Sequence, residues 1–75
     1  MKMQSCTENQ FHRIMYAAGG KQTRSEVGRT HSTTYWERYS TRLGVELDVV
    51  IGIKRTVLGD TTYEVAAFLY EAYIK

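Results

Sequence analysis

The sequence predicts a small α+β domain, in which an antiparallel hairpin or sheet is covered by an N-terminal and a C-terminal helix. Residues 45–57 alternate apolar and polar side chains, which is typical of a half-buried strand. Residues 7–18 and 61–74 instead repeat apolar side chains at helical spacing. Because 75 residues are too few to build two separate cores, we expect residues 1–75 to form a single domain.

A helix is predicted over residues 7–18. Thr7 and Gln10 have the spacing of a capping box, in which both side chains satisfy backbone N–H groups at the start of a helix. Four apolar residues at i, i+3, i+4 and i+7 would share its buried face: Phe11, Ile14, Met15 and Ala18. Gly19 and Gly20 would end it, because glycine adopts the left-handed conformation of a C-terminal cap without steric cost.

The segment 30–41 permits two interpretations. Its Thr, Tyr and Trp content favours a strand, whereas the hydroxyl residues 32–34 followed by Glu37 resemble the start of a short helix over 35–43. We favour the strand, because a long strand at 45–57 needs a neighbour for its backbone donors and acceptors. Residues 42–44 would then connect the hairpin, and a short third strand could occupy 21–29.

The strand at 45–57 is the most regular element of the chain. Its apolar residues recur at every second position and are largely β-branched, which suits a pleated surface. We expect one face of this strand to lie beneath the helices and to carry Val45, Leu47, Val49, Ile51 and Ile53.

A second helix is predicted over 61–74, with Asp60 or Thr61 as its N-cap. Its core stripe would consist of Val65, Phe68, Leu69 and Ala72. A second, less polar stripe runs along the other side and contains Tyr63, Ala67, Tyr70 and Ile74. A helix that is apolar on two sides in so small a domain offers one side to a partner. We therefore predict a protein-binding ridge of Tyr63, Tyr70 and Ile74, which could also be the seam of a homodimer.

The charges predict an alternative, nucleic-acid-binding surface. Residues 12–42 contain six Lys and Arg against two Asp and Glu, whereas residues 43–75 contain three against five. In this alternative, basic side chains would contact phosphates and Trp36 would stack on bases. The residues proposed for it are Arg24, Arg29, Trp36, Arg38 and Arg42. The opposing interpretation places Trp36 in the core, because a small domain needs its largest apolar side chain inside.

No motif in the sequence indicates catalysis, a metal or a cofactor. Cys6 is the only cysteine, and its spacing to His12 and His31 matches no zinc or nucleophile pattern. Gly19-Gly20-Lys21 lacks the spacing and the hydroxyl residue of a phosphate-binding loop. A lone thiol suits a reducing compartment, and no apolar run reaches the length of a membrane span, so a cytoplasmic location is expected.

The predicted function is therefore binding, without catalytic residues, metal or cofactor. Our first hypothesis is a protein-binding inhibitor or adaptor, of the compact kind that phages and mobile elements encode, with another protein as its partner. The alternative is a nucleic-acid-binding regulatory protein that uses segment 12–42.

Overall fold

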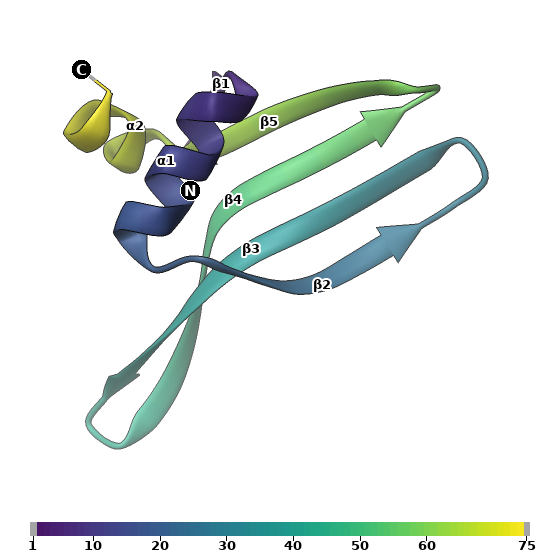
Figure 1. The fold of residues 1–75 in the computed structure, drawn as a ribbon. Helices are drawn as coiled ribbons and strands as arrows, with labels where there is room; N and C mark the ends of the chain where they lie inside the picture. Colours follow the sequence, from purple (N-terminus) through teal and green to yellow (C-terminus); the bar gives the residue numbers. More distant parts are fainter. Residues whose placement is uncertain (1, 75) are drawn as a thin grey trace.

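The chain forms an α+β fold with a five-stranded antiparallel sheet and two helices (Figure 1). A computed structural model describes residues 2–74, with side chains at 2–39, 43–45 and 49–74. In chain order the elements are β1 (Met3–Cys6), α1 (Glu8–Ala18), β2 (Lys21–Val27), β3 (His31–Arg42), β4 (Val45–Val57), β5 (Asp60–Ala66) and α2 (Ala67–Tyr73).

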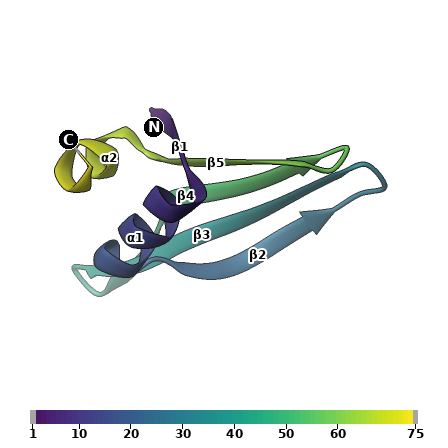
Figure 2. The ribbon, with the colours of Figure 1, turned by 45° about the horizontal axis from the view of Figure 1, so that its top comes forward.

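The strands β2 to β5 follow one another as consecutive hairpins, and β1 joins the far side of β5. The order across the sheet is β1-β5-β4-β3-β2, so β1 and β2 form its two edges. Figure 1 shows the β2–β3 and β4–β5 turns together at one end of the sheet, while the β3–β4 turn extends in the opposite direction. Figure 2 shows α1 and α2 beside the end of the sheet where the chain begins and ends.

Helix α1 confirms the N-terminal prediction in detail. The Thr7 hydroxyl accepts the Gln10 N–H at 3.2 Å, and the Gln10 side-chain carbonyl accepts the Thr7 N–H at 3.0 Å. Gly19 closes the helix in the left-handed conformation, with φ at 75°. The four residues of the expected apolar face are all buried: Phe11, Ile14, Met15 and Ala18.

The segment 30–41 is a strand, so the alternative helix over 35–43 is wrong. β3 pairs with β4 over its whole length, from His31 opposite Val57 to Arg42 opposite Val45. The neighbouring segment 21–29 contributes the edge strand β2, as expected for a third strand. The short strand β1 had no counterpart among the elements predicted from the sequence.

A β-bulge divides strand β4 and corrects the expected face. Trp36 pairs with Gly52, but Glu37 pairs with Val50, which leaves Ile51 as the extra residue on β4. Ile51 is buried in the core and Val49 packs against it, whereas Val45 is exposed. Ile53 lies beyond the bulge and is not among the core residues, because the extra residue moves it to the other side of the sheet.

The predicted helix over 61–74 is wrong in its first half. Residues 60–66 form β5, which pairs with β4 on one side and β1 on the other, so Asp60 and Thr61 cap no helix. Only residues 67–73 are helical, and Ala66 makes no side-chain cap. The expected core stripe divides accordingly: Val65 and Leu69 are buried, whereas Phe68 and Ala72 are exposed.

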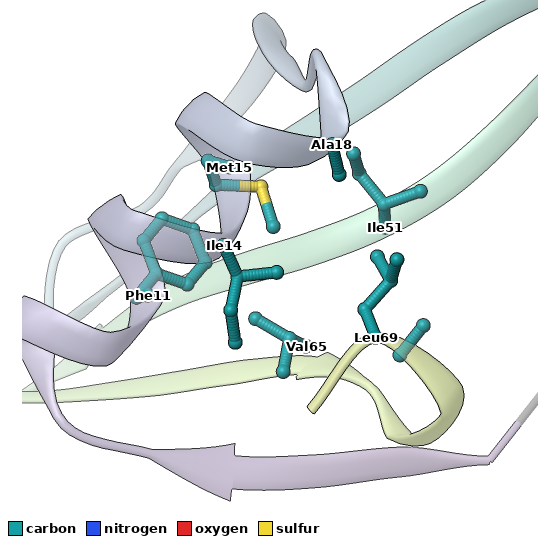
Figure 3. Packing of buried hydrophobic residues seen from close by; sticks show 8 residues of the cluster. Phe11, Ile14, Met15, Ala18, Ile51, Val65 and Leu69 are labelled. Atoms are coloured by element: carbon teal, nitrogen blue, oxygen red, sulfur yellow. The ribbon is translucent and has the colours of Figure 1, made fainter. Parts of the chain in front are cut away.

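The core lies between α1, α2, the middle of β4 and the C-terminal end of β5 (Figure 3). Figure 3 shows the α1 side chains directed toward Ile51, Val65 and Leu69. Gly52 permits this contact, since a Cβ there would lie 2.8 Å from both Phe11 and Met15. We call the side of the sheet that contacts Phe11 the helix face, and the other side the open face. In the described part of the chain, neither helix is long and apolar enough to cross a membrane.

Candidate protein-binding surface

The open face carries a charged and aromatic group centred on Tyr35. The Arg24 guanidinium lies over the Tyr35 ring, 4.2 Å from its centroid. The Arg24 Nε lies 3.4 Å from a Glu37 carboxylate oxygen, and the Thr23 hydroxyl donates to the same oxygen. The Glu37 side chain is buried, with 4% of its surface exposed. Arg24 is therefore engaged by an aromatic ring and an acid of its own sheet.

Trp36 and Arg38 lie on the helix face instead. The Trp36 ring packs edge-on against Phe11 at 5.6 Å between centroids and is half-buried beside the core. Arg38 Nη1 donates to the carbonyl of Ala18 at 3.2 Å, at the C-terminal end of α1, where a cation complements the helix dipole.

The proposed nucleic-acid residues are thus divided between two sides of the sheet. Arg24 lies on the open face, and Arg38 and Trp36 lie on the helix face. Arg29 lies in the β2–β3 turn, and the side chain of Arg42 is outside the described side chains. The open face also mixes signs, since Arg55 pairs with Glu64 at 2.9 Å. Nucleic-acid binding stays a prediction, for which this arrangement supplies no continuous basic surface.

The residues of the predicted protein-binding ridge do not share a helical stripe. Tyr63 is in β5, where its ring packs against Phe11 at 5.1 Å. Tyr70 and Ile74 are partly buried and pack against the core. Two other residues of α2, Phe68 and Tyr73, are exposed instead. A binding role for Tyr63, Tyr70 and Ile74 remains a prediction without the common ridge that suggested it.

Three exposed apolar side chains lie on the far part of the β3–β4 hairpin, and one of them, Leu43, is the most exposed large apolar side chain of the described residues. Residues 38–49, which we call the ribbon, are the part where β3 and β4 pair only with each other, because β2 ends its pairing at Glu37 and β5 at Gly52. At its tip Leu43 is 98% exposed, and Tyr39 and Val45 are also exposed. The ribbon therefore holds large apolar groups in water beyond both helices (Figure 1).

Leu43 also occupies an unfavourable backbone conformation. Its φ is 54° and that of Gly44 is 78°, which is the left-handed pair of a type I′ hairpin turn. Asn, Asp or Gly normally occupies the first of these positions, because a larger side chain with positive φ costs on the order of 1 kcal/mol or more. A leucine here is thus both exposed and strained.

A second Leu-Gly turn joins β4 and β5 at the opposite end of the sheet. Leu58 has φ 50° and is 75% exposed, and Gly59 follows with φ 86°. The Leu58 N–H donates to the Thr30 carbonyl at 2.9 Å, and this hydrogen bond connects the β4–β5 turn to the β2–β3 turn. An open depression of about 350 Å³ lies between these turns, with exposed Val27 on its rim. The Leu-Gly pairs were the signal in the sequence that could have identified both tips.

Cys6 and Tyr63 line another surface depression, of about 410 Å³, beside the start of α1. Partial burial, followed by the negative charge of Glu64, raises the pKa of the Cys6 thiol. Desolvation raises the pKa of Tyr63, and the charge of Glu8 and a hydrogen bond to it act in the same direction. Both shifts favour the protonated form of the group. Among the described residues, no three His, Cys, Asp or Glu side chains are grouped to hold a metal ion.

Comparisons of the chain with protein-family models, with curated proteins and with solved structures found no match.

Proposed function

We propose that this chain is a protein-binding module without catalytic activity, an inhibitor or adaptor, which inserts the tip of its ribbon into an apolar groove of another protein. The observation that carries this proposal is Leu43, which is 98% exposed and has a left-handed backbone conformation. A residue that is unfavourable for both solvation and backbone conformation suggests selection for something other than the stability of the free protein.

The ribbon has the features of an interface anchor. Leu43 presents an aliphatic side chain at the tip, and Tyr39 and Val45 are exposed behind it on opposite faces of the two strands. In typical interfaces a few central side chains contribute most of the affinity, and tyrosine, as at position 39, is enriched among them. A two-stranded ribbon is narrow, so it suits a groove more than a flat surface.

Protein is the partner that these groups fit best. The ribbon tip offers apolar contact area, whereas a nucleic-acid surface needs several cations that face the same way. Arg24 and Arg38 are directed to opposite sides of the sheet, and each has a contact within the chain. Aromatic and aliphatic anchors are instead typical of protein interfaces.

The test uses the two Leu-Gly turns as matched sites. Leu43→Asn replaces the exposed anchor by a residue that favours the left-handed conformation, and Leu58→Asn makes the same change at the opposite end of the sheet. Both variants should fold with equal or higher stability. In affinity capture from the native host, Leu58→Asn should retain the proteins bound by the wild type, and Leu43→Asn should lose them.

With a purified partner, Leu43→Asn should weaken binding by about 1–3 kcal/mol, the range of an anchor residue. Calorimetry or surface plasmon resonance measures this difference. Equal binding by the two variants would remove the ribbon tip from the interface. Loss of binding only in Leu58→Asn would move the site to the other end of the sheet.

A further inference from the structure

The outer edge of β2 can pair with a second strand. β2 pairs with β3 along one side, and along its other side no described strand lies next to it. All seven of its residues, Lys21–Val27, are exposed. Unpaired strand edges are templates for further pairing, and natural proteins usually shorten, bend or shield them.

The hairpin geometry shows which backbone groups point outward. The Gly28 N–H donates to the His31 carbonyl at 2.6 Å, so these two residues form a bonded pair next to the turn. Bonded and non-bonded pairs alternate along an antiparallel ladder. Glu26 is therefore bonded to β3, and the N–H and C=O groups of Ser25 and Val27 point to the outer edge. A bulge at Thr23 limits the regular part of this edge to residues 24–27.

When β2 pairs with β2 of a second copy, one register places oppositely charged side chains opposite each other. Arg24 and Glu26 both lie on the open face, on either side of Ser25 in the sequence. If Ser25 of one chain pairs with Ser25 of an antiparallel second copy, each Arg24 lies opposite the other copy's Glu26. Opposite charges in directly facing positions stabilise strand pairing, and the two-fold axis produces this contact twice.

The neighbouring registers lack this complementarity. A pair centred on Arg24 or on Glu26 sets two like charges opposite each other, which destabilises the pairing. A pair centred on Val27 brings the β2–β3 turn of each copy next to β2 of the other copy, so fewer β2 residues can pair. Glu26 is exposed and has no ion pair among the described residues, and Arg24 keeps 58% of its side chain exposed beside its contacts with Glu37 and Tyr35.

We propose that the protein forms a two-fold homodimer through β2, in the Ser25 register, which joins two five-stranded sheets into one. The dimer uses the β2 edge and does not depend on the function proposed for the ribbon. Because edge pairing over a few residues buries little surface, the dimer belongs to the weak class of associations. The partner is a second copy of this chain, since the complementary charges lie on the same strand.

Sedimentation velocity of the full chain tests the dimer, at concentrations up to about 1 mM because the buried area is small. The wild type should dimerise, more weakly at high salt because the paired charges are exposed. Glu26→Arg should weaken dimerisation by about tenfold or more, since both charge contacts become repulsive. Glu26→Arg mixed with Arg24→Glu should form a heterodimer, in which every facing pair again has opposite signs.

Two further variants test the backbone contact. Chemically synthesised protein with an N-methyl group on Ser25 should lose dimerisation, because the outward N–H is removed while the bonds to β3 remain. Its control, Ser25→Ala, should dimerise like the wild type. Circular dichroism verifies that each variant is folded. If Arg24→Glu unfolds because the new carboxylate repels Glu37, Glu26→Arg and the N-methyl protein still test whether the dimer forms through β2.

Three results would overturn the proposal. The first is a monomer at about 1 mM, a concentration high enough to populate even weak associations. The second is a dimer whose affinity is unchanged by both Glu26→Arg and N-methylation of Ser25. The third is a dimer that survives these changes but is lost in Phe68→Ala, which would place the seam on α2 as the sequence first suggested.

Discussion

Leu43 and Leu58 are two residues at which the leucine side chain is expected to lower the stability of the free protein. Each adopts a positive φ that asparagine tolerates better, and each exposes its side chain. We expect Leu43→Asn and Leu58→Asn each to raise the free energy of unfolding by up to about 1 kcal/mol, since backbone strain is relieved and little burial is lost. Urea unfolding monitored by Trp36 fluorescence measures both; a loss of stability would mean that the leucine contacts matter more than the strain.

Gly52 is a residue where close packing excludes any side chain. A Cβ at this position would lie 2.8 Å from Phe11 and Met15, which are both buried. We expect Gly52→Ala to destabilise the fold by about 1–3 kcal/mol through overpacking. Met15→Val in the same background should recover part of this loss, because it removes the sulfur and terminal methyl group that the new Cβ meets. Additive effects in this double-mutant cycle would contradict the proposed contact.

Cys6 tests the local electrostatics of β1. Burial and the charge of Glu64 raise the pKa of this thiol, so less of it is thiolate near pH 8. Cys6 should therefore react with iodoacetamide more slowly in the folded protein than in urea. Glu64→Gln should increase the folded-state rate, since it removes the charge that raises the pKa. Equal rates in folded and unfolded protein would show that the environment of Cys6 has no such effect.

At the scale of elements, α1 was predictable because its signals are local. The capping box, the apolar spacing and the Gly19 cap all lie within a few residues of one another, and each is present. The strand at 45–57 was predictable for the same reason, through its alternation. Neither the bulge at Ile51 nor the consequent displacement of Ile53 could be predicted, because a bulge depends on the register with the facing strand.

The C-terminal element was mispredicted because its residues fit two periods. Val65 and Leu69 are four positions apart, which suggested one helical stripe. Both side chains are buried, but Val65 belongs to β5 and Leu69 to α2. Pairing with both β4 and β1 decides the outcome for residues 60–66, and neither neighbour is close in sequence. The isolation of the ribbon was missed for a related reason, since it follows from where β2 and β5 end.

The orientation of α2 leads to a prediction about two adjacent residues. Leu69 is 6% exposed and packs in the core, whereas Phe68 is 54% exposed. Leu69→Ala should therefore cost about 2–4 kcal/mol of stability, and Phe68→Ala less than about 1 kcal/mol. Chemical denaturation of both variants provides the comparison. A larger loss for Phe68→Ala would place Phe68 in the core, where the sequence predicted it together with Leu69.

At the scale of the whole molecule, stability should differ between the ribbon and the body. The core residues Ile51 and Val65 lie where three strands and both helices meet, whereas Leu43 and Val45 belong to two strands alone. Two-stranded hairpins are only marginally stable by themselves. Amide hydrogen exchange should thus be faster at Val45 and Val49, which pair only with β3, than at Gly52 and Val65. Slow exchange at Val45 in the monomer would show that the ribbon is stabilised by contacts within the chain.

The pairing of β1 with β5 has a consequence for how the protein is made. Met3 lies opposite Ala66, so the first strand finds its neighbour only after most of the chain has been synthesised. Until then the apolar face of α1 has neither Val65 nor Leu69 to pack against. Such long-range contacts slow folding and favour an all-or-none transition in a small domain. A nascent chain that ends before residue 60 would lack β5 and three of the eight buried apolar residues described in the core, and it would be a substrate for chaperones or proteases.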